Sequence, residues 1–186
     1  MKRLNRCILE AALLLGALLF GTSGARAHSC EGTEECIDLL ELELLIGAKF
    51  SYAWARETVG EHGAGAGLFV ELPLIPGHLD VELSGQVLRF HGDAWEVPVD
   101  LLVKGSTSVG EALRLYVGIG PAIAVRVEHD ERTTLVGAVF ACGAYLWVTT
   151  RFGLDLELNY GLFGRAQHPV HDVTVSIGPV VRFFDS

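Results

Sequence analysis

Hydrophobic and polar positions alternate with a period of two along most of the chain, and residues 111–127 show the pattern best. The odd-numbered positions from Leu113 to Val127 are all apolar, whereas the even-numbered positions hold small residues, Tyr116 and two arginines. This alternation indicates a β-strand with one apolar face. Strands of soluble proteins usually have about five or six residues, whereas a strand of a transmembrane barrel needs about 9–11. The segment therefore favours a membrane-spanning barrel.

Seven further segments alternate in the same way. The expected strands cover residues 42–54, 63–74, 79–87, 95–104, 111–127, 134–148, 154–162 and 172–183. The links between them include a tight turn at Ile75–Pro76–Gly77 and a flexible link from Gly105 to Gly110. Strands with one apolar and one polar face are typical of a transmembrane barrel, which must close because a free edge would leave backbone groups unpaired in lipid. The expected fold class is all-β, an eight-stranded antiparallel up-and-down transmembrane β-barrel over residues 40–186.

Two features of the pattern need a specific interpretation. Pro98, Pro121 and Pro179 lie inside expected strands, where a proline removes a hydrogen-bond donor. Because a closed barrel has no edge strand, we expect each proline to mark a β-bulge or a strand end. In the segment 134–148 the even-numbered set is the more apolar, so we place it outward and its odd-numbered set, with Tyr145, inward.

The first 27 residues resemble a secretory signal peptide in composition. A basic start precedes a short apolar run over residues 11–20, and Ala25–Arg26–Ala27 forms a small-x-small cleavage site. The apolar run is too short for a spanning helix, which needs about 20 residues. We therefore expect residues 1–27 to be cleaved and residues 28–39 to form a polar lead-in in the periplasm. The barrel would then lie in the outer membrane of a Gram-negative-type bacterium.

The net charge and the cysteine content limit the partners and cofactors that can be expected. The formal net charge of −9 argues against nucleic acid as a partner. Cys30 and Cys36 lie close together in an exported segment, where a disulfide is favoured over free thiols or a metal site. No set of histidines and cysteines has the spacing of a zinc site, so we expect no cofactor and no metal.

Several segments resemble one known family. They are Val97–Leu102, Leu115–Pro121, Cys142–Tyr145, Leu154–Tyr160 and Ser176–Phe183. These segments resemble the small eight-stranded outer-membrane β-barrel proteins of the OmpW-like and OmpX-like type. The resemblance implies the barrel fold, the outer-membrane location and prolines within the fourth and fifth strands, but it implies no particular activity.

Charged residues recur on the face that the alternation places inside the barrel. The predicted lumen charge network consists of Glu41, Glu43, Lys49, Glu71, Asp80, Glu82, Glu96, Asp100, Lys104, Arg114, Arg126, Asp155, Glu157 and Arg182. An eight-stranded barrel is just wide enough for its own side chains to fill it, so paired ions are expected to plug the lumen. The alternative is a small ion- or solute-conducting pore, which the acidic excess would make cation-selective.

The remaining candidates concern catalysis and the outer surface. A lipid-A-modifying hydrolase is a less favoured alternative, because it would need serine and histidine on one face, and His171 and Ser176 differ in parity. His168 lies in the preceding loop. We therefore expect a non-enzymatic structural or interaction protein, monomeric, with outer-membrane lipid as its partner and an unidentified protein or surface ligand bound through its loops. Tyr52, Trp54, Trp95 and Tyr160 are expected to form an aromatic girdle at the membrane interface.

Overall fold

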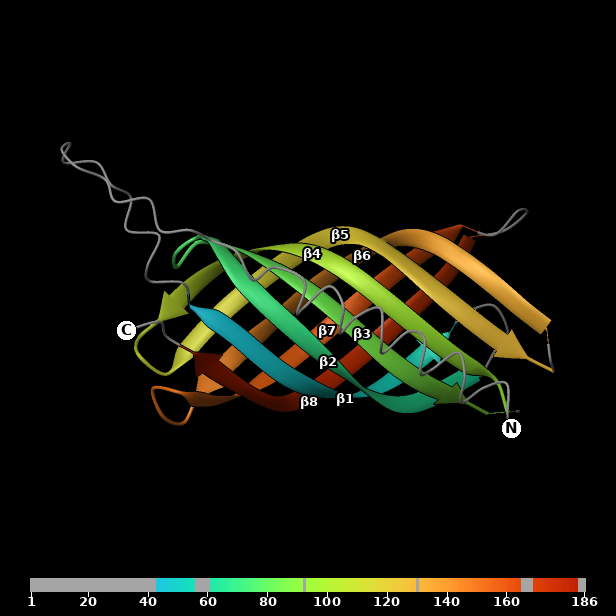
Figure 1. Ribbon diagram of the computed structural model, residues 1–186, viewed down its shortest axis with the longest axis horizontal. Helices are drawn as coiled ribbons and strands as arrows, with labels where there is room; N and C mark the ends of the chain where they lie inside the picture. Colours follow the sequence, from blue (N-terminus) through green and yellow to red (C-terminus); the bar gives the residue numbers. More distant parts are fainter. Residues whose placement is uncertain (1–42, 56–60, 92, 130, 165–168, 184–186) are drawn as a thin grey trace, which may run out of the picture. The chain divides into compact units, whose positions relative to one another are not determined.

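The computed structural model describes residues 43–55, 61–91, 93–129, 131–164 and 169–183 (Figure 1). All of them belong to one compact unit that spans residues 39–186. The described residues contain no helix long and apolar enough to cross a membrane. Several predictions fall outside this part of the chain: the signal peptide, the lead-in, Cys30, Cys36, Glu41 and His168.

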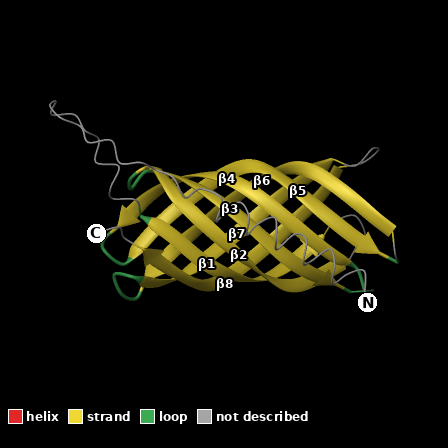
Figure 2. Ribbon diagram, in the orientation of Figure 1, coloured by secondary structure: helices red, strands yellow, loops and turns green. Residues whose placement is uncertain are grey.

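Eight antiparallel strands form a closed barrel, in which each strand pairs with the next and β8 pairs with β1 (Figures 1 and 2). The strands are β1 (Leu44–Ala55), β2 (Glu61–Ile75), β3 (Leu79–Phe90), β4 (Trp95–Val109), β5 (Leu113–Glu128), β6 (Glu131–Trp147), β7 (Phe152–Gly164) and β8 (Pro169–Phe183). The predicted fold class is therefore confirmed.

The two ends of the barrel are distinguished by the strands that they join. At one end, called the terminal end here, β1 begins, β8 ends, and turns follow β2, β4 and β6, drawn in green at the left of Figure 2. The opposite end, called the loop end, carries the connections that follow β1, β3, β5 and β7. The predicted turn at Ile75–Pro76–Gly77 is present, with Gly77 at φ 76° and the His78 amide donating to the Ile75 carbonyl.

Alternation along each strand separates an outer face from an inner face. In β5, Val117 is 66% exposed on the outer wall, whereas the neighbouring Tyr116 is buried inside. In β6 most even-numbered residues, such as Val136, are exposed, Ala138 and Ala144 are half-buried, and Tyr145 is fully buried. The facing chosen for this strand from its apolar content therefore agrees with the structure.

The predicted flexible link from Gly105 to Gly110 is wrong. Strand β4 continues to Val109, and its extension pairs with β5 from Gly105 opposite Val117 to Val109 opposite Leu113. A run of small polar residues has weak strand propensity, but here the neighbouring strand supplies the hydrogen-bonding partners. Only residues 110–112 form the turn.

The bulges predicted at prolines are also wrong. No register shift occurs at these prolines. One ladder continues through Pro98 opposite Ala124, Pro121 opposite Ala138 and Pro179 opposite Leu154, whereas the ladder to the other neighbour lacks pairs at each proline and resumes in the same register. An antiparallel strand directs each backbone N–H to one neighbour only, so a proline removes one ladder bond without requiring an extra residue. The described register shift between β2 and β3 lies instead between Pro73 and Ile75.

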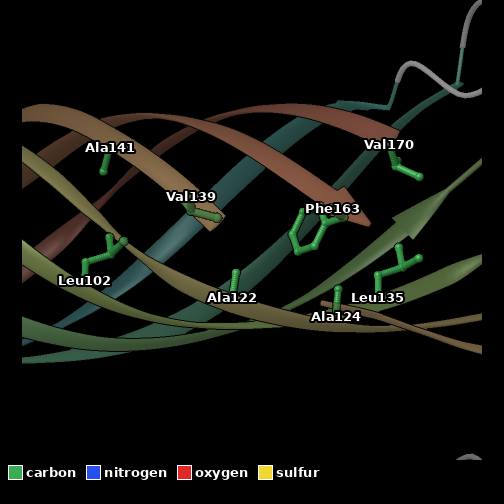
Figure 3. Close-up of a cluster of buried hydrophobic side chains, with 8 residues drawn as sticks. All are labelled: Leu102, Ala122, Ala124, Leu135, Val139, Ala141, Phe163 and Val170. Carbon is green, nitrogen blue, oxygen red and sulfur yellow. The ribbon is translucent and has the colours of Figure 1, made fainter. Parts of the chain in front are cut away.

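The inner face is not uniformly polar. Figure 3 shows a cluster of apolar side chains inside the barrel, which β4 to β8 contribute: Leu102, Ala122, Ala124, Leu135, Val139, Ala141, Phe163 and Val170. A second cluster combines Leu45, Phe69, Tyr116, Tyr145 and Val180. The charged residues therefore share the interior with apolar and aromatic side chains, whereas the alternation had suggested an interior filled by charge.

Candidate functional site

Two buried lysines lie among three carboxylates in the middle of the barrel. Lys49 Nζ donates to Glu82 at 2.8 Å and to Glu157 at 2.5 Å. Lys104 Nζ also donates to Glu82, and it lies 3.3 Å from both Glu71 and Glu157. Glu82 and Glu157 thus each contact both lysines. These five residues, called the central ion cluster here, are at most 3% exposed.

The central ion cluster crosses the interior of the barrel. Its members come from β1, β2, β3, β4 and β7, so the contacts join walls that are not neighbours in the sheet. Each member lies on the inner face because of its parity in its strand. Removing charged groups from water is costly unless each has several partners of opposite charge. The shared carboxylates meet this requirement for both lysines.

Aromatic side chains surround the lysines and contact the carboxylates. The Tyr145 hydroxyl donates to Glu71 at 2.6 Å and accepts from Lys104 at 3.1 Å. The Tyr116 hydroxyl lies 2.7 Å from Asp155 and 3.0 Å from Glu157, so it can donate to either carboxylate. The Tyr116 ring also lies beneath Lys104, with Nζ 4.0 Å from the ring centroid. This is the geometry of a cation–π contact.

Further ion pairs lie on the inner face at the terminal end. Arg114 Nη2 donates to Asp80 and to Ser106, each at 2.7 Å. Arg182 Nε lies 2.7 Å from Glu43, and its guanidinium stacks on the Trp147 ring at 3.7 Å from the centroid. These contacts connect β3, β4, β5, β6 and β8 across the opening of the barrel.

The loop end has one described inner arginine among several acids. Arg126 lies 2.6 Å from Glu61 and 3.7 Å from Glu128, and it pairs in register with Glu96. Glu61 and Glu128 were not among the predicted lumen residues. Both lie one step beyond the apolar part of their strands, so extending the alternation to the strand ends would have identified them.

Between the central ion cluster and the loop end, polar side chains leave little space. Ser51 Oγ donates to Gln86 at 2.6 Å and lies 2.8 Å from Ser176 Oγ. Gln86, Asp100, Asn159, Asp172 and other residues line a cavity of about 20 Å³. A cavity needs roughly 10–15 Å³ to hold one water molecule. This cavity therefore has room for about one water molecule.

The structure places the predicted lumen residues on the inner face, apart from Glu41, which lies outside the described part of the chain. It separates the residues considered for hydrolysis. His171 lies on the outer wall, with Nδ1 2.6 Å from the Tyr160 hydroxyl, whereas Ser176 is buried inside. Among the described residues, no group of three or more His, Cys, Asp or Glu side chains could hold a metal ion.

The outer wall carries a continuous apolar surface. Large exposed apolar side chains occur on every strand except β3, among them Phe50, Leu68, Leu101, Val117, Phe140, Leu156 and Ile177. On β3 the outward apolar residues are half-buried. Cys142 is also on this face, as an exposed free thiol. Soluble monomers rarely expose so large an apolar area, whereas a transmembrane barrel presents such a band to lipid.

Comparison with known proteins adds information on the fold. No protein-family model matches the chain, and no curated protein matches it. Neisserial surface protein A (NspA) is similar with a TM-score of 0.65 at 14% identity, over 75% of this chain and 97% of that chain. Ail, the attachment invasion locus protein of Yersinia pestis, is similar with a TM-score of 0.57 at 16% identity, over 77% of this chain and 99% of that chain.

The N-terminal β-barrel domain of Pseudomonas aeruginosa OprF gives a similar result. Its TM-score is 0.57 at 17% identity, over 76% of this chain and 97% of that chain. The chain has the fold of the small outer-membrane β-barrels. The predicted resemblance to these barrels is therefore confirmed for the fold. The apolar outer wall has the character of the lipid-facing band of a transmembrane barrel.

Proposed function

We propose that this outer-membrane barrel has a structural or interaction role and that its lumen is closed to ions. The central ion cluster is the observation that carries the proposal. Its lysines and carboxylates join five strands across the interior, and Tyr116, Tyr145 and Phe69 pack against the same ammonium groups. Eight strands leave an interior that side chains alone can fill.

Other parts of the interior support closure as well. The Arg114 and Arg182 contacts lie across the terminal end, and the cavity of about 20 Å³ further along is too small for a file of water molecules. An acidic excess would favour cations if a path existed, which makes a small cation-conducting pore the alternative. The barrel is proposed to act without catalysis, since His171 and Ser176 are on opposite faces.

Single-channel recording in planar lipid bilayers tests the closed lumen. The unmodified protein should give no steady current after insertion, which a heat-dependent shift in gel migration would verify for the same sample. A steady, large conductance would contradict the proposal and support the pore.

A double variant tests whether the central ion cluster is the reason why the unmodified protein gives no current. Lys104→Ser combined with Glu82→Ser removes one positive and one negative charge, so the net charge is unchanged while the central ion cluster is opened. We expect this variant to conduct measurably in the same bilayers. If it remains as silent as the unmodified protein while correctly inserted, the central ion cluster is not what closes the lumen.

Export and partners form part of the same proposal. Residues 1–27 are proposed to be removed on export, and Cys30 and Cys36 to form a disulfide in the periplasm. Mass spectrometry of the membrane-extracted protein, before and after reduction and alkylation, tests both. A ligand outside the cell is proposed to bind at the loop end.

A further inference from the structure

The outer wall has a hollow at its loop end that the apolar band does not explain. The hollow has a volume of about 450 Å³, and its polar lining residues are the five residues Tyr52, His62, Arg89, His91 and Asp93. Gly63, Ala64 and Phe90 complete the lining. These residues come from β1, β2, β3 and the connection that follows β3. Three of the five carry nitrogen donors, in a region where the rest of the barrel wall presents apolar side chains to lipid.

Ring contacts hold the walls of the hollow in place. The ring centroids of Tyr52 and His62 lie 6.0 Å apart and those of His62 and His91 5.8 Å apart, with both pairs stacked. Trp54 meets Tyr52 edge to face at 4.6 Å. The rings thus form a row across neighbouring strands.

Arg89 supplies the positive charge of the hollow. Its guanidinium lies 5.4 Å from the centroid of the Trp95 ring and its Nη2 2.9 Å from Asp93. Both members of this ion pair are largely exposed, at 60% and 85% of their side-chain surface. Exposed ion pairs contribute little free energy, and a guanidinium has five N–H donors. Arg89 can therefore bind a second anion while it contacts Asp93.

The position of the hollow relative to the membrane indicates the occupant. Phe50 and Leu68, each 60% exposed, lie further along β1 and β2 on the same wall. Tyr52, Trp54 and Trp95 border the hollow, and aromatic side chains of this kind collect at the level of the lipid headgroups. A molecule beside the hollow would place its acyl chains against the apolar wall and its headgroup against Arg89.

We propose that this hollow binds the phosphate group of a membrane lipid. A phosphate oxygen accepts charge-assisted hydrogen bonds from a guanidinium, and the His91 imidazole lines the same hollow. Asp93 disfavours a dianion that lacks a hydrophobic anchor, so the lipid chains are needed as well as the phosphate. This site lies on the outer wall and does not depend on whether the lumen conducts.

Native mass spectrometry of the full barrel tests the site. The protein would be released from detergent micelles doped with phosphatidic acid or with phosphatidylcholine of the same acyl chains. We expect selective retention of phosphatidic acid, whose terminal phosphate is accessible. The Arg89→Gln variant should retain it about tenfold less, as expected from the loss of one charge-assisted hydrogen bond, and Arg89→Lys should retain it partly.

The matched control is Arg151→Gln, which removes an exposed arginine from the turn after β6, at the terminal end. Its retention of phosphatidic acid should equal that of the unmodified protein. Equal retention of both lipids, or equal losses in Arg89→Gln and Arg151→Gln, would overturn the proposal. Displacement of phosphatidic acid by inorganic phosphate at comparable concentration would show a site for soluble anions, and the assignment to a lipid would then be wrong.

Discussion

Lys104 has no access to solvent, and its free energy in the folded state depends on Glu71, Glu82 and Glu157. Lys104→Met would leave Glu82 and Glu157 with Lys49, and it would remove the lysine that Glu71 contacts. We expect the variant to lose about 3–5 kcal/mol of the free energy of unfolding, the usual cost of breaking a buried pair on one side. Urea-induced unfolding from lipid vesicles measures this value.

The double variant Lys104→Met with Glu82→Gln is the control for that prediction. It removes one charge of each sign, so it should be more stable than Lys104→Met alone, although it has two substitutions. A double-mutant cycle isolates this coupling between neighbouring residues. Additive losses would mean that Lys104 and Glu82 do not stabilise each other, contrary to the contact seen between them.

Two residues of β5 test the difference between the faces of the wall. Arg114 faces inward and contacts Asp80, whereas Ile119 is half-exposed on the lipid-facing side. Arg114→Leu should destabilise the barrel because Asp80 loses its partner, and Asp80→Asn should restore part of the stability. Ile119→Arg should destabilise it by about 2–4 kcal/mol, because a charge near the bilayer midplane contacts lipid.

The free energy of unfolding of both variants is measured in vesicles whose bilayers have two different thicknesses. A thinner bilayer brings the lipid headgroups closer to the side chain introduced by Ile119→Arg, so this variant should lose less free energy of unfolding. The loss in Arg114→Leu should not change. The assignment of the two faces would be contradicted if both variants responded equally to bilayer thickness.

At the scale of the elements, close approach between strands explains certain glycines. A Cβ placed on Gly178 in β8 would lie 1.7 Å from the Ala48 carbonyl oxygen in β1, whereas one on Gly85 in β3 would meet no atom closer than 3.9 Å. We expect Gly178→Ala to lower the free energy of unfolding by about 1–3 kcal/mol, the usual effect of overpacking. Gly85→Ala should be nearly neutral, and equal losses in the two unfolding curves would refute the steric explanation.

The prolines show a limit of reasoning from single elements. Pro98, Pro121 and Pro179 each break a propensity rule that holds for isolated strands, yet the paired register continues through all three. Each proline forgoes a bond to one neighbour, and the rest of a ladder of 12–17 residues per strand fixes the register. The register is fixed by the paired strands together, so it cannot be inferred from one strand considered alone.

At the scale of the whole molecule, the aromatic residues should report the depth of the barrel in the bilayer. Trp54 and Trp95 lie on the outer wall at the loop end, whereas Trp147 faces inward at the terminal end. In single-tryptophan variants, lipids brominated near the headgroup should quench Trp54 and Trp95 best. Trp147 should be quenched weakly by every lipid. Strongest quenching of Trp54 by lipids brominated at the chain ends would contradict an interface girdle.

The sequence by itself was sufficient to predict the architecture. Alternation with a period of two is a local property, and eight such segments with apolar outer positions match a closed barrel in lipid. The same parity assigned Lys49, Glu82, Lys104 and Glu157 to the inside. Strand lengths were less accurate, as in the Gly105–Val109 extension of β4, because the partner strand decides where pairing stops.

Only the tertiary structure decided which charged side chains contact each other and where polar residues interrupt the apolar outer wall. Parity specifies a face but not a partner, and the lysines contact carboxylates from strands that are distant in sequence. The apolar cluster inside β4 to β8 escaped the pattern because its members are apolar, as the residues of the outer face are. The Arg89 hollow arises from three strands and a connection. Such features depend on closure of the barrel, which brings distant segments together and which no local pattern records.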